Sequence, residues 1–449
     1  MSASGPSEAK VRPFEVNSRA VLAIAVPMTL AFVTTPLLGL VDTAVVGRLG
    51  VAAQMGGLAV GAIVFDVVFT SMNFMRAGTT GLVAQAFGAQ DAPEQAAVVA
   101  RALVLALVLG LAALLFADPI LAAGLYFVAP EAAVAEAVAL YFGIRILAAP
   151  LTLANYVLLG WALGVARAGL GLALQVVLNG VNIALSLWLG LGLGWGIAGV
   201  AWATVIAEGI ALVAGLGALA FHLHGTALPA ARQLWQRAAF GRLFALNRDI
   251  LIRSFCLIGT FFAFTATGAR FGTDVLAANA VLMNFFMVAG FFLDGLATAA
   301  EQLAGRAVGA RWRPAFDASV RLSLLWGVVL GGALSLLFLL AGPILIDALT
   351  TNEAVRETAR LYLPWAAATA VAGAVAFQMD GVYIGATWSR EMRDWMLVST
   401  ALFVFVAWLA HDALGNHGLW LALLVFLGAR GLTLLLRLPG RRDQAFAAA

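Results

Sequence analysis

The sequence predicts an all-α polytopic membrane protein with twelve transmembrane helices in two pseudo-symmetric six-helix lobes. Three observations predict this class: the composition, the number of long apolar segments, and an internal repeat. Of the 449 residues, 63% are hydrophobic and only 11% are charged, whereas a soluble domain carries about 25% charged residues. The mean hydropathy of +0.98 points the same way. This composition excludes an ordinary soluble enzyme and a nucleic-acid-binding domain.

The apolar segments are long enough to be membrane-spanning helices. A helix needs about 20 apolar residues to cross the hydrocarbon core, and the chain lacks the alternating ten-residue segments of a membrane β-barrel. The predicted spans, in chain order, are 18–46, 56–84, 95–117, 132–165, 169–190, 196–222, 244–269, 275–305, 316–346, 355–386, 394–411 and 417–437. The apolar segment at 18–46 is too long for a signal-peptide core, so we interpret it as a retained first helix.

Positive charges in the connections predict the orientation of the chain. If the N-terminus is cytoplasmic, the cytoplasmic side holds Lys10, Arg12, Arg167, Arg232, Arg237, Arg242, Arg311, Arg313, Arg390, Arg393, Arg441 and Arg442. The other side holds little beyond Arg48, Arg270 and Arg356. The predicted organisation is a cytoplasmic leader (1–17), an N-lobe (18–222), a cytoplasmic linker (223–243), a C-lobe (244–437) and a cytoplasmic tail (438–449). The predicted location is a plasma membrane, in bacteria the inner membrane.

An internal repeat supports the two lobes. Gly88, Gly110, Tyr141, Gly160 and Gly164 match Gly309, Gly331, Tyr362, Gly381 and Gly385, always 221 positions later (309 − 88, for example). Six helices separate equivalent points, so both repeats have the same orientation in the membrane. Transporters built from such parallel halves bind solute near the midplane and expose it alternately to either side.

Asp42 is the leading candidate for a functional residue. A charged Asp at the centre of a membrane helix costs roughly 2.5–3.5 kcal/mol, so it should face a cavity or a partner. Burial favours the neutral acid, which would let Asp42 take up and release protons. Pro27 and Pro36 each remove a helix hydrogen bond and predict a bend, although static packing kinks are the alternative. Asp42 lies about 36 Å along the helix from Ser18, so a solvated helix-end residue is the competing interpretation.

Further polar residues are predicted to form a chamber in the N-lobe. Asn179, Asn182 and Ser186 follow the spacing i, i+3, i+7, which places them on one helix face. Tyr141, Asn155 and Thr204 on neighbouring spans would complete the chamber. Simple hydrogen-bonded cross-links between helices are an equally good explanation for each residue.

The C-terminal half offers alternative acids but no catalytic constellation. Asp294 and Asp380 are the deep carboxylates there, whereas Asp249 and Arg253 are four residues apart and suited to pair with each other. No Gly-rich phosphate loop is followed by Lys-Ser or Lys-Thr, and Cys256 is the single cysteine. The four histidines lie at span ends or in loops. We therefore predict no enzyme activity, no metal site and no cofactor, with an ion gradient as the energy source.

Several long strings resemble the MATE (multidrug and toxic compound extrusion) family, and its DinF-like branch in particular. They are "PMTLAFVTTPLLGLVDTAVVGRLG", "NIALSLWLGLGLGWGIAGVAWATVIAE", "LNRDILIRSFCLIGTFFAFTATGARFG", "VLAANAVLMNFF" and "DGVYIGATWSREMRDWML". The resemblance runs through nearly all spans and implies efflux of organic, often cationic, compounds against H⁺ or Na⁺. It also implies that Asp42 is the coupling acid and that Asn182, Thr204 and, more loosely, Tyr141 and Asn155 belong to its polar network.

One position departs from the family pattern. The family's fifth span commonly reads Asn-Ile-x-Leu-Asp, whereas Leu185 is followed here by Ser186. The missing carboxylate favours H⁺ over Na⁺ as the coupling ion. Export of an endogenous metabolite and Na⁺ coupling remain alternatives. A lipid-linked precursor flippase is disfavoured because the deep residues are mainly acidic or neutral. The expected partners are small-molecule substrates and the lipid bilayer, without nucleic acid; a monomer is plausible.

Overall fold

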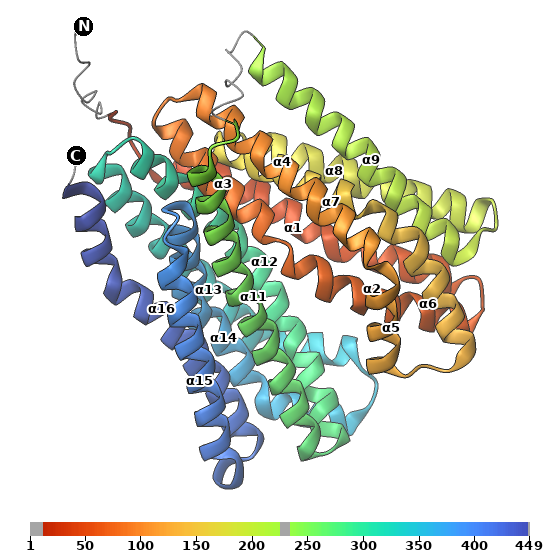
Figure 1. Ribbon diagram of the computed structural model, residues 1–449. Coiled ribbons are helices and arrows are strands. Elements are labelled where there is room, and N and C mark those ends of the chain that lie inside the picture. Colours follow the sequence, from red (N-terminus) through yellow and green to blue (C-terminus); the bar gives the residue numbers. More distant parts are fainter. Residues whose placement is uncertain (1–11, 225–233, 448–449) are drawn as a thin grey trace, which may run out of the picture. The chain divides into compact units, whose positions relative to one another are not determined.

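The computed structural model of the protein describes residues 12–224 and 234–447 (Figure 1). All regular secondary structure within these residues is helical. The first part contains α1 (Ser18–Gly47), α2 (Ala52–Ser71), α3 (Phe74–Gly88), α4 (Ala92–Leu115), α5 (Ala117–Val128), α6 (Ala132–Arg145), α7 (Ala149–Gly164), α8 (Ala168–Leu185) and α9 (Gly196–Leu223). The second part contains α11 (Arg237–Gly268), α12 (Thr273–Gly309), α13 (Arg313–Leu349), α14 (Glu353–Gly385), α15 (Ser389–Leu414) and α16 (Asn416–Ala447).

Twelve helical segments of the described residues are long and apolar enough to cross a membrane, which confirms the predicted fold class. Three of them are interrupted or change their winding. The second span breaks between α2 and α3, and the fourth passes through the 3₁₀ turn η1 (Ile146–Ala148) between α6 and α7. The fifth span continues from α8 into the π-helix η2 (Ser186–Gly192). A further short element, the 3₁₀ turn η3 (Ala269–Phe271), ends the seventh span.

At the end of the π-helix η2, backbone amides donate to carbonyls five or six residues earlier in the chain. The amide of Leu193 donates to the carbonyl of Trp188 at 2.8 Å, and that of Trp195 donates to the carbonyl of Leu189 at 3.0 Å. Gly194 and Gly196 then adopt φ values of 72° and 60°, which glycine tolerates without a steric penalty. Isolated π-turns are frequent at functional sites, and this one begins at Ser186.

Helix α5 lies almost entirely between the third and fourth predicted spans, in a segment for which the sequence predicts no helix. It has 12 residues, which is too short to span the bilayer, and none of its residues is buried. Asp118 lies in its first turn, where a carboxylate stabilises the helix dipole. Tyr126 and Phe127 are both more than 80% exposed, as expected for aromatic residues at a membrane interface.

Helices α11 and α16 extend furthest beyond their predicted ends. Helix α11 begins at Arg237 rather than at residue 244, and α16 continues to Ala447 rather than ending at residue 437. Ion pairs between the start of α13 and the end of α16 explain the second extension: Arg442 contacts Asp317 and Arg313 contacts Asp443, each at 3.2 Å. Most of the predicted leader, with Lys10, and residues 225–233 of the predicted linker, with Arg232, lie outside the described residues.

The described residues pack into two compact units. The C-unit comprises those of Met1–Thr29, Ala84–Gln90 and Arg248–Ala449, and the N-unit comprises those of Leu30–Val83 and Asp91–Asn247. The division falls inside α1, two residues after Pro27. Each unit has its own apolar core, formed around Phe65 and Phe142 in the N-unit and around Phe264, Trp420 and Phe426 in the C-unit.

Glycines that match across the repeat have equivalent packing. A Cβ atom at Gly160 would lie 2.5 Å from the backbone oxygen of Arg76, and one at Gly381 would lie 2.2 Å from that of Ala297. Both members of each pair are 221 positions apart (381 − 160 and 297 − 76). Within the C-unit, a Cβ at Gly88 would meet the backbone oxygen of Arg306 and one at Gly309 would meet that of Gln85. The internal repeat therefore includes equivalent close contacts between helices, at positions where only glycine fits.

Candidate functional site

Asp42 lies inside the N-unit near the end of α1, with 7% of its side chain exposed. Its Oδ1 accepts a hydrogen bond of 2.8 Å from the hydroxyl of Ser186. Ser186 is fully buried at the first position of η2. The structure thus joins the predicted acid to the residue that replaces the family's second Asp, and it does not place Asp42 at a solvated helix end.

A chain of hydrogen bonds continues from Ser186 across three helical elements. The Ser186 hydroxyl lies 3.1 Å from Oδ1 of Asn182, and Nδ2 of Asn182 donates to the hydroxyl of Thr204, also at 3.1 Å. Thr204 donates in turn to the backbone oxygen of Val200 at 3.3 Å. Four of the predicted residues (Asp42, Asn182, Ser186 and Thr204) therefore form one connected network.

The Ser186 hydroxyl has one hydrogen but two acceptors within reach. An ionised Asp42 accepts that hydrogen, which leaves Oδ1 of Asn182 without it. A protonated Asp42 can donate to Ser186, which then donates to Asn182. Protonation of Asp42 therefore reverses the hydrogen bond between Asp42 and Ser186 and turns the Ser186 hydroxyl towards Asn182.

Asn179 lies on a separate branch of the same helix. Its Nδ2 donates to the hydroxyl of Thr34 at 2.7 Å, and its Oδ1 accepts from Nε2 of Gln175 at 3.2 Å. The hydrogen bond between Asn179 and Thr34 connects α8 to α1 at a different position from the bond between Ser186 and Asp42. Asn179 thus holds the two helices together without contacting the acid.

Tyr141 belongs to a cluster around Arg145, which the sequence analysis missed. Nη1 of Arg145 donates to the Tyr141 hydroxyl at 2.7 Å, and the guanidinium lies 4.6 Å from the ring centre of Phe65. Arg145 also interacts electrostatically with Asp42 and with Asp66 of α2. It is the positive charge that faces the N-unit acids.

Asn155 contacts a second missed residue, Glu208 of α9. Nδ2 of Asn155 donates to the Glu208 side chain at 2.6 Å and to its backbone oxygen at 2.9 Å. Glu208 is only 8% exposed. Tyr141 and Asn155 therefore lie beside the hydrogen-bonded chain of Asp42 and contact their own charged partners.

The sequence contains a signal that could have identified the missed charged residues. Asp66, Arg145 and Glu208 are ionisable residues inside predicted spans, which is the criterion that selected Asp42. Arg253 and Arg430 of the C-unit satisfy it as well. The buried polar side chains of the described residues are nonetheless mainly acidic or neutral, as predicted, with Arg101 and Arg430 as exceptions.

The two prolines lie within a continuous α1. Helix α1 extends from Ser18 to Gly47 and contains both Pro27 and Pro36. Each ring still leaves one carbonyl of the preceding turn, that of Ala23 or Phe32, without a helix donor. At these two positions the helix that carries Asp42 therefore lacks a backbone hydrogen bond.

Asp380 of the C-unit is enclosed by two arginines. It forms ion pairs with Arg253 of α11 and Arg430 of α16, and both Asp380 and Arg430 are buried. Such a triad holds three helices together and does not leave Asp380 free for a substrate. Asp294 has an exposed side chain on α12 and interacts electrostatically with Arg430.

Asp249 does not pair with Arg253, contrary to the interpretation from their spacing. It contacts Arg393 of α15 at 2.8 Å and Arg248 at 3.1 Å, and it accepts a hydrogen bond from Ser389. The tertiary partner on α15 replaces the local one. Asp249 thus fastens α11 to the start of α15.

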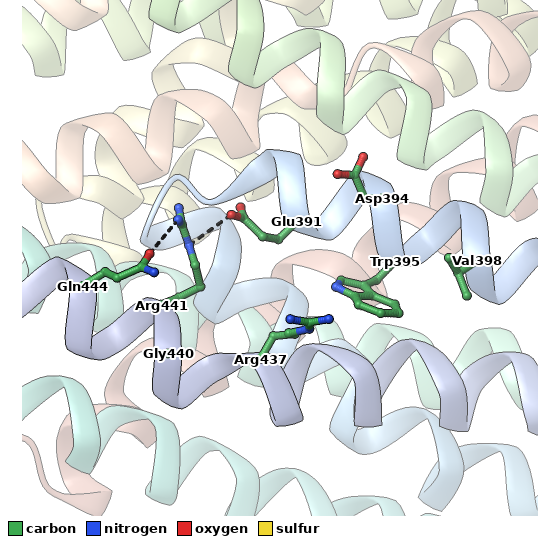
Figure 2. Close-up of a pocket in the computed structure, with 8 residues that line it drawn as sticks. All are labelled: Glu391, Asp394, Trp395, Val398, Arg437, Gly440, Arg441 and Gln444. Atoms are coloured by element: carbon green, nitrogen blue, oxygen red, sulfur yellow. Dashed lines mark hydrogen bonds and ion pairs between the residues drawn. The ribbon is translucent and has the colours of Figure 1, made fainter.

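A small charged pocket lies between α15 and α16 of the C-unit (Figure 2). It has a volume of about 380 Å³. Arg441 forms an ion pair of 3.1 Å with Glu391, and the guanidinium of Arg437 lies 5.2 Å from the ring centre of Trp395. Figure 2 shows Arg441 between Glu391 and Gln444. The pocket contains none of the predicted site residues, and Glu391 and Arg441 within it are paired with each other.

Comparison with known proteins decides the family. The MatE family model matches residues 27–188 and 250–410 of the chain. The chain belongs to the MatE family. The two matched segments of this MATE protein begin 223 positions apart (250 − 27), which agrees with the internal repeat.

Curated relatives and solved structures extend this result to nearly the whole chain. The chain is 42% identical to DNA damage-inducible protein F of Escherichia coli (strain K12), over 93% of this chain and 91% of that protein. It is 31% identical to the probable multidrug resistance protein NorM of Deinococcus radiodurans, over 93% and 94% of the two chains. A MOP superfamily transporter from Pyrococcus furiosus has the same fold, with a TM-score of 0.87, 17% identity and coverage of 95% and 96%. The protein is an integral membrane transporter of the MATE family, as its DinF-like strings indicate.

Proposed function

We propose that this MATE protein is a proton-coupled antiporter that exports organic, often cationic, compounds. The proposal rests on one observation: the carboxylate of Asp42 is buried in the N-unit and bonded to a hydroxyl that has two acceptors. A proton at this position changes the charge of the chamber and, at the same time, reverses the hydrogen bond between Asp42 and Ser186.

The proton and the cationic substrate would compete for the same chamber. An ionised Asp42 attracts a cationic substrate, and a proton removes that attraction. Since each ligand lowers the affinity for the other, proton entry favours substrate release, and the effect is reciprocal. Protonation on the outer side would then release the cargo, and deprotonation on the inner side would restore the binding state.

The donor set favours H⁺ over Na⁺. Sodium would need several oxygen ligands around the acid, and the position that supplies a second carboxylate in the family pattern is Ser186. Its hydroxyl already binds Asp42 and lies within reach of Asn182. A single carboxylate with a hydroxyl and amide neighbours is sufficient to hold one proton.

The fold supplies the conformational change. Two units built on a parallel repeat can expose a central site alternately to each side. A related MATE transporter has been solved in an outward-facing conformation, and bent and straight conformations of a MATE protein are also known. In this chain, loss of the charge on Asp42 would bend α1 at Pro27. We place the protein in the bacterial inner membrane with both termini in the cytoplasm.

The cargo class is supported by relatives and by charge. One relative is named as a probable multidrug resistance protein, and the acids of the N-unit suit an organic cation. Export of an endogenous metabolite would use the same geometry. A transport screen with charged and neutral solutes distinguishes the two.

The test compares Asp42→Asn with the wild type in proteoliposomes. Efflux of a fluorescent organic cation is measured under an imposed pH gradient and, in parallel, under an imposed Na⁺ gradient. We expect a pH-driven flux in the wild type and its loss in Asp42→Asn, because asparagine cannot exchange a proton. Asp118→Asn, which alters an exposed acid of α5, serves as the matched control and should retain the flux.

Undiminished pH-driven efflux by Asp42→Asn would refute the proposal. A wild-type flux that follows the Na⁺ gradient alone would replace H⁺ by Na⁺ as the coupling ion.

A further inference from the structure

The strongest unexplained group in the N-unit is Glu208, which lies in the middle of α9. We propose that Glu208 is a second proton-binding acid, coupled to Asp42 through Arg145, so that the N-unit takes up two protons rather than one. This inference rests on the proposed proton-coupled function and extends it to a second site.

Neutral donors hold the Glu208 carboxylate. The amide of Asn155 donates to it at 2.6 Å, and the hydroxyl of Thr152 is a second neutral group that stabilises its charged form. No Lys, Arg or His among the described residues forms a direct ion pair with Glu208. A carboxyl group in this setting keeps a hydrogen-bonded place in both protonation states, which a purely structural ion pair does not offer.

The elements packed against α9 supply few charges. Helix α8, η2 and η1 carry no titratable side chain. Helix α6 contributes Arg145, Tyr141 and the exposed Glu136, and α7 contributes Tyr156. Helix α2 contributes Asp66, and α9 itself carries only His222 besides Glu208. Arg145 is therefore the cation that these elements present to the acid, and it interacts electrostatically with Glu208.

Arg145 is shared among three carboxylates. Among these described residues it forms no direct ion pair with Asp42, Asp66 or Glu208, and its positive charge acts on them over a longer distance. One guanidinium compensates one negative charge, so the cluster cannot keep all three acids ionised inside a membrane without a large penalty. Protons are the ligands that restore the balance, and the two buried acids, Asp42 and Glu208, are the groups placed to bind them.

The shared cation makes the two acids interdependent. When Asp42 binds a proton, Arg145 is left to compensate Glu208 more fully, which favours the charged form of Glu208. When Asp42 is ionised, Glu208 favours its neutral form. Coupled acids of this kind titrate in two steps that belong to the pair.

The competing explanation is that Glu208 only anchors α7 to α9. In that case it would keep one protonation state over the working pH range, and its replacement by the uncharged isostere would leave proton binding unchanged. The geometry predicts the opposite result.

Infrared difference spectroscopy of the lipid-reconstituted protein tests this prediction without substrate. The carboxylic C=O bands of the wild type, Glu208→Gln, Asp42→Asn and the matched control Glu136→Gln are recorded during a pH titration. Besides the bands of the exposed acids, we expect two bands that titrate in the wild type and persist in Glu136→Gln. Glu208→Gln should lose one band, and Asp42→Asn should lose the other while the remaining transition moves along the pH axis. Asn155→Ser provides a second variant, which should shift the Glu208 band and not abolish it.

Two results overturn the inference: a Glu208→Gln spectrum identical to that of the wild type, or a remaining band in Asp42→Asn that does not move. Both infrared measurements are made without substrate and do not depend on transport. Failure of the proposed antiport would instead appear as undiminished pH-driven flux in Asp42→Asn, so the two failures are distinguishable.

Discussion

At the scale of single residues, Ser186 determines how Asp42 responds to a proton. Its one hydroxyl hydrogen is divided between a carboxylate and an amide oxygen. A second Asp at this position would instead repel Asp42 or share a proton or cation with it. The serine therefore makes Asp42 a single acid with an adaptable hydrogen-bond partner.

Ser186→Ala should shift the pH dependence of transport. Loss of the hydroxyl removes a donor to the charged form of Asp42, so the neutral form is favoured and protonation occurs at higher pH. A hydrogen bond to a charged group contributes about 1.5–3 kcal/mol, which corresponds to an alkaline shift of about one to two pH units. Efflux from proteoliposomes at a series of pH values measures the midpoint. Ser186→Thr retains the hydroxyl and should stay near the wild type; an unshifted alanine variant would contradict the role of Ser186.

Ser186→Asp should add a response to sodium. Ser186 and Asp42 are 2.8 Å apart at their oxygens, so a second carboxylate would create a paired acid site of the kind that cations bridge. We expect a Na⁺ gradient to drive efflux in this variant and not in the wild type. Ser186→Asn, similar in size but uncharged, is the control. If a Na⁺ gradient drives efflux in neither variant, the missing carboxylate does not determine which ion is coupled to transport.

The sequence predicted the polar residues of the site better than their partners. Asp42, Asn182, Ser186 and Thr204 were selected by helix spacing and by their resemblance to a family pattern, and these four lie in one hydrogen-bonded chain. The assignments of Tyr141 and Asn155 lacked Arg145 and Glu208, because spacing within a helix does not determine which neighbouring helix it meets. Asp249 shows the same limit: an arginine four residues away predicted a local pair, but a distant one on α15 forms it.

At the scale of the elements, hydropathy located all twelve spans but not their irregularities. The break between α2 and α3, the π-helix η2 and the interfacial α5 depend on backbone hydrogen bonds and on contacts that an average over many residues does not register. The predicted start of α11, at residue 244, is later than the observed Arg237, and the predicted end of α16, at residue 437, is earlier than the observed Ala447. Ion pairs such as that of Arg442 with Asp317 stabilise the polar turns that extend α16.

Adjacent glycines of α13 provide a test of close helix packing. A Cβ at Gly331 would lie 2.6 Å from the backbone oxygen of Ala370, whereas one at Gly332 would meet nothing within 4 Å. Gly331→Ala should therefore lower the stability, by about 1–3 kcal/mol from overpacking. Gly332→Ala is the matched control and should be neutral or slightly stabilising in the helix. Thermal unfolding in detergent measures both; equal midpoints would contradict the close approach of α13 and α14.

At the scale of the whole molecule, twelve spans place both termini on the same side of the membrane. Charge asymmetry predicts that this side is the cytoplasm. The internal repeat, the matched glycine contacts and the two matches to the family model all describe the same duplication. The sequence therefore predicted the architecture well, because its period and its apolar segments are spread over the entire chain.

The orientation can be tested because Cys256 is the single cysteine. In a Cys256→Ser background, Gly169→Cys should react with a membrane-impermeant maleimide only after the cells are opened. Thr273→Cys should react in intact cells with a permeable outer membrane. Both positions are exposed, and neither substitution changes the charge of a connection. The reverse pattern of labelling would invert the predicted topology.

The ion pairs of Arg253 and Arg430 with Asp380 have a consequence for biogenesis. Arg253 is translated 127 residues before the acid that neutralises it (380 − 253), and Arg430 another 50 residues after that acid. We therefore expect α11 to enter the insertion machinery with an uncompensated guanidinium, whose release into lipid costs free energy until α14 arrives. The last six spans should leave the translocon as a group, and nascent chains truncated before residue 380 should remain substrates for membrane quality-control proteases.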